Sequence, residues 1–152
     1  MWRLSLPFAL NNWNDNRRDR IAENKILTEI SIGLDKDLDD IALNMEGHKT
    51  GIYACNYFRK MSINHEVDQD SIFFHYFNLT RDFISVQNSA GYETLKSRGL
   101  ELIQNDSLRQ SIISLYEYDY NTLRKFEEEY TEMQFHENYF YEVNEILSPA
   151  FK

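Results

Sequence analysis

The sequence predicts an all-α protein, and three features of the chain lead to that prediction. Both prolines lie near the ends, at Pro7 and Pro149, so no proline interrupts a helix between them. Only five of the 152 residues are glycine, so few positions favour a break. Two long stretches carry apolar residues at alternating steps of three and four, the spacing of a helix that packs along one side. Long, uninterrupted helices are therefore expected.

The first predicted helix covers about residues 14–60, and either Asn12 or Asn14 can cap its start. A heptad-like stripe runs along it, as in a coiled coil. The stripe consists of Leu27, Ile30, Leu34, Leu38, Ile41, Met45, His48, Ile52 and Cys55. The weak points of this helix are three glycines, Gly33, Gly47 and Gly51. A kink is allowed near the last two.

A second helix is expected after the polar break at residues 62–67, and Asp68 or Asp70 can cap it. It is rich in aromatic residues, which predicts that one side of it packs against the first helix. Its apolar members are Ile72, Phe73, Tyr76, Phe77, Phe83 and Ile84.

The third predicted helix is short. It starts near Asn88 or Ser89 and carries Tyr92 and Leu95 on its inner side. Gly99 is placed to end it, because the residue after a helix often adopts positive φ, which glycine does without strain.

The last predicted helix covers about residues 106–147. Asn105 caps its start, and Ser148 and Pro149 mark its end. Its stripe consists of Ile112, Tyr116, Asp119, Leu123, Phe126, Tyr130, Met133, Glu137 and Phe140. Two members are polar, so this stripe is looser than that of a pure zipper.

These lengths predict one arrangement. Two long helices run antiparallel as a coiled-coil-like stalk, and two short helices complete a four-helix head at the far end. A single helical domain is expected over residues 12–148, with a tail at 149–152. Residues 1–11 are apolar but too short to span a membrane, so they are interpreted as the end of a membrane span or as an appended leader.

Composition narrows the classes of partner. The formal net charge of −9 argues against nucleic acid as the main partner, because phosphate binding depends on clustered Lys and Arg. One cysteine, Cys55, excludes an intrachain disulfide and any multi-cysteine metal site. Aromatic residues make up 14% of the chain, more than a slim helical domain easily hides. Some of that surface is expected to face a protein partner.

Three segments of the chain carry recognisable motifs. Residues 9–18 contain Asn-Asn-Trp-Asn followed by charged helix, residues 92–103 contain Tyr-Glu-Thr-Leu-Lys-Ser-Arg-Gly, and residues 105–116 contain the helix start that follows. Together they resemble an uncharacterised family of small membrane proteins from Gram-negative bacteria. The order and spacing also fit, and the resemblance covers most of residues 9–125. It implies a single N-terminal membrane span ahead of the domain, and it carries no assigned activity.

Trp13 is the most informative single residue of that junction. A Trp between an apolar segment and a charged helix suits a membrane interface. It can equally pack against Tyr139 or Val143 on the returning helix, and both interpretations stay open.

No motif for catalysis or for cofactor binding stands out. The four histidines are interpreted as core or interface residues: His48, His65, His75 and His136. An acidic run keeps helical spacing, so it is interpreted as a solvated helix surface: Asp35, Asp37, Asp39 and Asp40. Cys55 lies in the apolar stripe and is expected to be buried and inert. No catalytic residue, metal site or cofactor is therefore predicted.

Two functions from different classes remain. The first is a non-enzymatic, membrane-anchored interaction or structural domain that binds protein partners or itself through the stalk. Its candidate interaction residues are Trp13, Phe135, Tyr139, Phe140 and Tyr141. The alternative is a ligand-sensing or enzymatic bundle with a site in the four-helix head. Its candidate pocket residues are Cys55, His75, Tyr76 and Tyr92.

Membrane topology also has two interpretations. Arg17, Arg18 and Arg20 beside a span would place the domain in the cytoplasm by the positive-inside rule. Relatives in the family look more basic before the span, which implies a periplasmic domain attached to the inner membrane. We favour the periplasm as an expectation.

Overall fold

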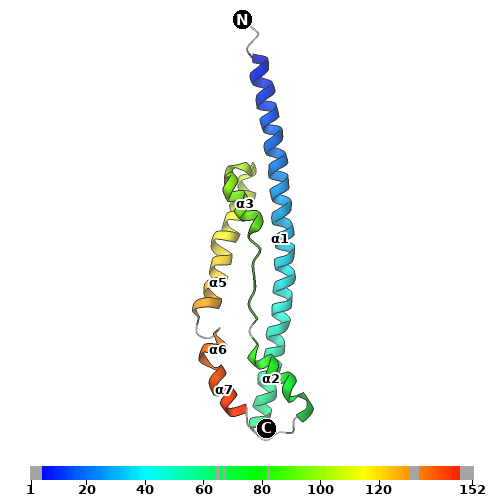
Figure 1. Ribbon diagram of the computed structural model, residues 1–152, viewed down its shortest axis with the longest axis vertical. Coiled ribbons are helices and arrows are strands. Elements are labelled where there is room, and N and C mark those ends of the chain that lie inside the picture. Colours follow the sequence, from blue (N-terminus) through cyan, green and yellow to red (C-terminus); the bar gives the residue numbers. More distant parts are fainter. Residues whose placement is uncertain (1–4, 64–65, 67, 82, 131–133, 148–152) are drawn as a thin grey trace. The chain divides into compact units, whose positions relative to one another are not determined.

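The computed structural model describes residues 5–63, 66, 68–81, 83–130 and 134–147 (Figure 1). Within those ranges every regular element is helical, so the predicted all-α class is confirmed. The helices are α1 (Ser5–Ser62), α2 (Ile72–Thr80), α3 (Ala90–Arg98), α4 (Asp106–Ser114), α5 (Tyr120–Glu129), α6 (Phe135–Asn138) and α7 (Phe140–Leu147).

The chain divides into two compact units that share α1. Unit 1 comprises Met1–Asp37 and Gln87–Asn121, and unit 2 comprises Leu38–Val86 and Thr122–Lys152. Unit 1 therefore contains the first part of α1 with α3 and α4, and unit 2 contains the rest of α1 with α2, α5, α6 and α7.

The start of α1 corrects the predicted boundary. The helix already begins at Ser5, so Asn12 and Asn14 lie inside it and do not cap it. Pro7 does not prevent this, because a proline in the first turn removes an N–H that has no intrahelical partner. The helix then continues through Gly47 and Gly51 as one element to Ser62.

The buried side of α1 also differs from the predicted stripe. Leu38, Met45 and Ile52 of the predicted stripe are exposed. The buried positions of this helix are Ile26, Ile30, Gly33, Asp37, Gly47, Ala54 and Tyr57, and its half-buried positions include Leu27, Leu34, Asp40, Ile41, Asn44 and Gly51. The prediction is therefore confirmed for Leu27, Ile30 and Leu34, whereas farther along the helix mostly small and polar residues occupy the inner face.

Close approach of residues from the segment 83–89 explains this burial of glycines. A Cβ atom on Gly47 would overlap the ring of Phe83, and one on Gly33 would lie 3.3 Å from Oδ1 of Asn88. Glycine therefore serves packing at these positions, where the sequence suggested only weak points. A larger residue on this face would push its neighbours away from α1.

The second helix ends earlier than predicted. Asp68 accepts a bond from Asp70 N and caps a short 3₁₀ turn, Gln69–Ser71, directly before α2. The helix stops at Thr80, and residues 83–89 are irregular, so Phe83 and Ile84 are not helical. Carboxylates from neighbouring helices accept N–H bonds from this segment, which removes the need for helical hydrogen bonds there.

The predicted corner between the third and fourth helices is confirmed. Ser89 precedes α3, and Gly99 follows it with φ +103°. Oδ1 of Asn105 accepts a hydrogen bond from Leu108 N at 3.0 Å, so Asn105 caps α4 as expected.

The single helix predicted over 106–147 is wrong. A π-helical turn, Leu115–Asp119, joins α4 to α5, and α5 ends at Glu129. The helical chain resumes in α6 and α7. The last turn of α5 contains acidic residues and no basic ones, which disfavours continuation because a helix C-terminus carries partial negative charge.

The hydrophobic core of unit 1 is formed by α1, α3, α4 and their connections. Large side chains from these elements pack together there. Leu95 and Ile103 are completely buried. The remaining buried members are Ile26, Ile30, Tyr92, Ile112 and Tyr116.

Candidate functional site

Asp37 is the most buried charged residue that the structure describes. Its side chain is 4% exposed although it belongs to α1, a helix with a largely solvated surface. Oδ1 accepts a bond from Asn88 N at 2.7 Å, and Oδ2 accepts one from the Tyr120 hydroxyl at 2.6 Å. The solvated-surface interpretation is therefore wrong for Asp37, which fastens two other segments of unit 1 to α1.

Three tyrosines lie next to this aspartate in unit 1. The rings of Tyr92 and Tyr116 stack with centroids 4.5 Å apart, and Tyr120 meets Tyr116 edge-on at 5.2 Å. Burial first, and then the bond to the Asp37 carboxylate, raise the pKa of Tyr120 above its ordinary value. Burial also raises the pKa of Tyr116. These hydroxyls stay protonated near neutral pH and serve as hydrogen-bond donors.

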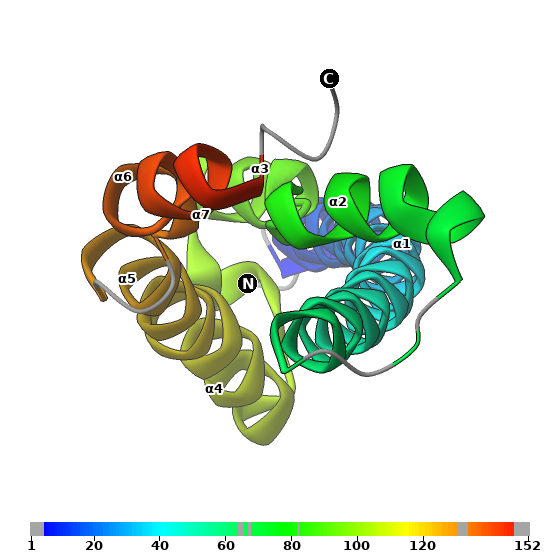
Figure 2. The same cartoon turned by 90° about the horizontal axis from the view of Figure 1, so that it is seen from below.

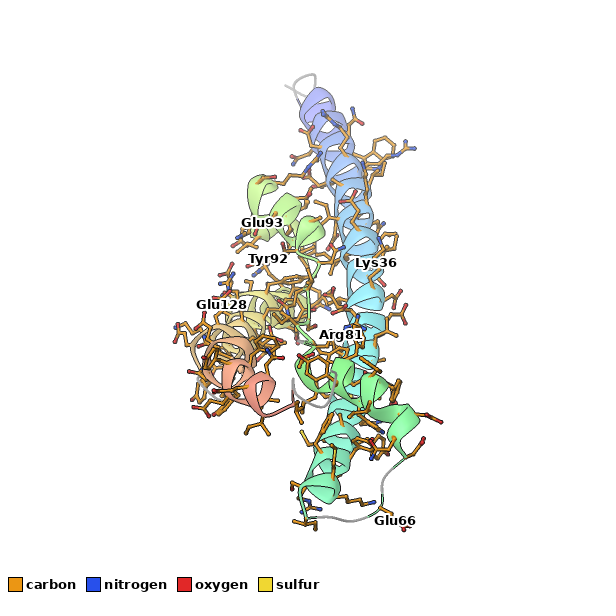
Figure 3. All side chains as sticks on the ribbon, turned by 60° about the horizontal axis from the view of Figure 1, so that its bottom comes forward. Lys36, Glu66, Arg81, Tyr92, Glu93 and Glu128 are labelled. Carbon is orange, nitrogen blue, oxygen red and sulfur yellow. The ribbon has the colours of Figure 1, made fainter. Side chains whose placement is uncertain are left out.

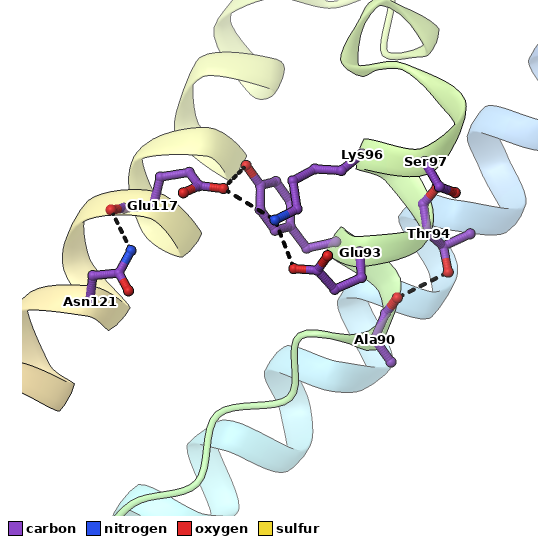
Figure 4. Close-up of polar contacts among 8 residues, drawn as sticks. Ala90, Glu93, Thr94, Lys96, Ser97, Glu117 and Asn121 are labelled. Atoms are coloured by element: carbon purple, nitrogen blue, oxygen red, sulfur yellow. Dashed lines mark hydrogen bonds and ion pairs between the residues drawn. The ribbon is translucent and has the colours of Figure 1, made fainter.

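Tyr92 and Lys96 are one helical turn apart, an arrangement in which a lysine could in principle promote tyrosine ionisation. Here the Tyr92 hydroxyl donates to Oε1 of Glu117 at 2.9 Å. Burial, followed by that bond, raises the pKa of Tyr92 to about 12. Lys96 is itself paired with Glu93 at 2.8 Å and with Glu117 at 3.5 Å (Figure 4). The Tyr92 hydroxyl therefore keeps its proton near neutral pH, which makes it a poor general acid or base.

Asp40 has a comparable role in unit 2. Its Oδ2 accepts bonds from Val86 N, from Ser85 Oγ and from Asn44 Nδ2, each at 3.0 Å. The solvated-surface interpretation is therefore wrong for Asp40 as well, whereas Asp35 and Asp39 are exposed as expected. The arrangement is structural, since each donor belongs to the protein itself.

The second part of α1 carries an apolar stripe that is exposed at every position except the half-buried Ile41. We call it the α1 stripe: Leu38, Ile41, Met45, His48, Ile52 and Cys55. Leu38 is 66% exposed and Ile52 is 60% exposed, and both are large apolar residues. Cys55 is also exposed, so the prediction of a buried cysteine is wrong. The apolar spacing found in the sequence is real, but it lies on the solvent side of the helix.

Unit 2 exposes a second apolar group on α2. Phe73, Phe74 and Phe77 are all largely exposed on this short helix. The guanidinium of Arg81, labelled in Figure 3, lies 5.5 Å from the ring centre of Phe77 and 5.0 Å from that of Phe83. The inner side of α2 faces the end of α1 (Figure 2), where His75 stacks on Tyr57 with ring centres 4.1 Å apart.

The residues predicted for a head pocket do not gather within one unit. Tyr92 belongs to unit 1, whereas Cys55, His75 and Tyr76 belong to unit 2. The Tyr76 hydroxyl donates to Oδ1 of Asn144 at 2.6 Å. Nδ1 of His75 is buried and has no hydrogen-bond partner among the described residues.

The predicted interaction residues have different environments. Trp13 is exposed, with the Arg17 guanidinium 5.8 Å from its ring centre. Tyr139 and Tyr141 are exposed near and within α7, and Phe140 is half-buried. Phe135 belongs to α6, but its side chain lies outside the described residues, as does that of His136. His65 also lies outside them.

Neither a metal centre nor a membrane span is found in the described part of the chain. No three His, Cys, Asp or Glu side chains within it come close enough together to hold a metal ion. None of its helices contains a stretch that is long and apolar enough to cross a membrane.

Comparison with known proteins gives no match: no protein family, curated protein or solved structure is similar to this chain.

Sequence reasoning missed the two aspartates that fasten other segments to α1. The signal that could have identified them is periodicity, since Asp37 and Asp40 occupy the same helical side as Gly33, Gly47 and Ala54. A stripe of small and acidic residues parallel to an apolar stripe indicates two sides with different partners. The large apolar residues of α1 were predicted to be its buried side because core positions are usually apolar.

Proposed function

We propose that this chain is a non-enzymatic helical interaction domain, with unit 2 as the part that binds a protein partner. One observation carries the proposal. Unit 2 contains most of the large apolar side chains that the structure exposes, including Leu38, Met45, Ile52, Phe74 and Phe77. Leu38, Met45 and Ile52 share one side of α1, and an exposed apolar patch on a folded domain is typical of a binding surface.

The chemistry of unit 1 supports a structural role for that unit. Tyr92 is paired with Glu117 and Tyr120 with Asp37, and the raised pKa of both tyrosines removes them as proton carriers near neutral pH. Asp37 is occupied by two donors of the same chain. Such a network stabilises the packing of α1 without leaving a reactive group available.

The resemblance adds finer parts to the proposal. We infer an N-terminal inner-membrane anchor before α1, a periplasmic domain, and membership of the uncharacterised Gram-negative family. A two-helix stalk with a four-helix head, and self-association through that stalk, belong to the same proposal. The exposure of Trp13 beside Arg17 supports a place near lipid headgroups.

Photo-crosslinking in living cells tests the proposed function. A photoreactive amino acid replacing Ile52 is expected to give an adduct of one defined mass. The same residue replacing Leu43, which is 72% exposed but lies roughly 140° around α1 from Leu38, serves as the matched control. Absence of an adduct from Ile52, Phe74 and Phe77 in a correctly folded chain would overturn the proposal, as would an equally strong adduct from Leu43.

The alternative, a ligand-binding bundle, is favoured by one observation. Nδ1 of His75 is buried without a partner among the described residues, and a ligand could satisfy it. Nuclear magnetic resonance of the His75 ring during a screen of small molecules tests this function. A ligand that shifts the His75 signal and raises the melting temperature would support it.

A further inference from the structure

We infer that the α1 stripe packs against the same stripe of a second copy of this chain, with the two α1 helices antiparallel. The inference rests on the proposed function of unit 2, and it names both the partner and the surface. It does not depend on the membrane anchor.

The geometry of the stripe suits another helix. Leu38, Met45 and Ile52 are seven residues apart, and Ile41, His48 and Cys55 follow three residues after each of them. This is the spacing of the two core positions of a coiled coil, in which side chains of one helix enter gaps on another. The three leading residues are each more than half exposed, so their core positions are unfilled within the chain.

The charges beside the α1 stripe favour a second copy of the chain as the partner, in the antiparallel orientation. Asp39 and Glu46 lie in the first half of the α1 stripe, whereas Lys49 lies in its second half and Arg59 and Lys60 follow its end, and all five are exposed. An antiparallel second copy places the acidic half of one helix along the basic half of the other. A parallel copy would place each half beside its like. The segment is therefore complementary to itself in the antiparallel direction.

The same geometry fixes a register. In an antiparallel pair, the first core position of one helix packs across from the second core position of its partner. Leu38 then faces the partner's Cys55, Ile41 faces the partner's Ile52, and Met45 faces the partner's His48. Lys49, which bonds its own Glu46 at 2.6 Å, lies beside the partner's Glu46. Four charges thus alternate in sign at the centre of the pair.

Antiparallel pairing sends the two N-termini in opposite directions. With an inner-membrane anchor before α1, the pair requires that α1 lies along the membrane. Cross-linking of the anchored protein therefore reports on this arrangement as well as on the direction of pairing.

Sedimentation of the purified chain is the first test. The expected species at micromolar concentration is a dimer that weakens as salt rises, because part of its stabilisation is charge pairing. Ile52→Glu is expected to raise the dissociation constant at least about 100-fold by burying a charge in the interface. Leu43→Glu, on another side of α1, is expected to leave it unchanged. Circular dichroism confirms that each variant is folded.

Cysteine cross-linking is the second test. Leu38→Cys is expected to form a disulfide with the partner's Cys55 under mild oxidation, whereas Leu43→Cys is not. The wild-type chain is expected to stay unlinked, because the two Cys55 residues of the pair would be about 25 Å apart.

Three results would overturn the inference. Efficient linkage of wild-type Cys55 to itself would show a parallel pair. A monomer that persists at high concentration would show that no second copy binds. A monomer in solution combined with a cellular adduct at Ile52 of a different protein would remove the second copy but leave the proposed function intact.

Discussion

Units 1 and 2 use the same α1 helix in opposite ways. In unit 1, α1 contributes Ile26 and Ile30 to a closed apolar core, and its buried aspartate is fully bonded. In unit 2, the inner face of α1 is mostly small and polar apart from Tyr57, and Leu38, Met45 and Ile52 face outward. Unit 1 encloses an apolar core, whereas unit 2 exposes more apolar surface that a partner can cover.

This contrast indicates how one helix can combine stability with binding. A helix has a limited circumference, so a face used for internal packing is unavailable to a partner. Small residues such as Gly47 allow other segments of unit 2 to lie close against α1, with the Phe83 ring beside Gly47 and the Asp40 carboxylate bonded to Val86 N. The large apolar residues then remain on the outer face.

The largest effect expected comes from removing the same side chain in each unit. Leu95, in unit 1, is 0% exposed, so Leu95→Ala should destabilise the fold by about 2–5 kcal/mol through lost burial and a cavity. Leu38, in unit 2, is 66% exposed, so Leu38→Ala should cost about 0.5 kcal/mol or less. Urea unfolding at low protein concentration measures both. Equal losses would mean that unit 2 is packed as tightly as unit 1.

Glycine substitution sharpens the comparison next. A Cβ on Gly91 would lie 2.8 Å from Ile30 N and 2.9 Å from Ile30 Cγ1, so Gly91→Ala should cost about 1–3 kcal/mol by forcing α3 away from α1. A Cβ on Gly51 would lie 3.5 Å from Asn78 O, an ordinary contact. Gly51→Ala should therefore stabilise α1 by up to about 1 kcal/mol. Thermal unfolding distinguishes these opposite signs.

Gly99 isolates a backbone effect from a packing effect. Its φ is +103°, and a Cβ there would meet nothing within 4 Å, so any loss must come from backbone strain. Gly99→Val should destabilise unit 1 by about 1–3 kcal/mol. Gly99→Ala should cost less, because alanine lacks the β-branch that makes positive φ most strained. Chemical unfolding of both variants checks this order, and equal stability of Val and wild type would exclude strain at this corner.

The sequence predicted some features of the fold correctly and missed others. The cap at Asn105 and the stop at Gly99 were predicted correctly because each depends on one residue and its local backbone. The inner face of α1 was missed because burial there is decided by segments distant in sequence, such as Phe83 against Gly47. The break after Glu129 was missed because apolar spacing continues past it.

Some residues of the candidate site could likewise be predicted from the sequence, and others could not. Exposed Trp13 and Tyr141 could be named from composition and position. The roles of Asp37 and Asp40 could not, because an aspartate on a helix gives no sign of the N–H groups that will face it. The pocket prediction around His75 and Tyr92 assumed one head, whereas these residues belong to different units.

Alkaline pH tests the tyrosine network of unit 1. The folded state raises the pKa of Tyr92 from 10.0 to about 12, so the protonated hydroxyl is favoured by folding. This contribution is complete below pH 10 and is lost as pH rises through 12. Its size is about 1–2 kcal/mol, reduced by screening because Glu117 is partly exposed. Unfolding measured from pH 8 to 12 should show a steeper loss for wild type than for Tyr92→Phe. Parallel curves would exclude Tyr92 as a source of the loss.

The smallest effects are expected at the exposed members of the block that resembles the bacterial family. Glu93 and Lys96 form an ion pair on the outer side of α3, and Lys96 also lies 5.1 Å from the ring centre of Tyr92. Exposed pairs of this kind contribute little, because water and salt screen them. Glu93→Ala and Lys96→Ala should therefore shift the melting temperature by about 2 °C or less. If the role of residues 92–103 is structural, Gly99→Val lowers the melting temperature, whereas Glu93→Ala and Lys96→Ala leave it nearly unchanged. If Gly99→Val melts like wild type, and either alanine variant abolishes a cellular phenotype while the fold stays intact, the outer side of α3 is itself a binding surface. Unit 1 would then have a binding role of its own, because binding would require the polar face of α3 as well as the apolar face of unit 2.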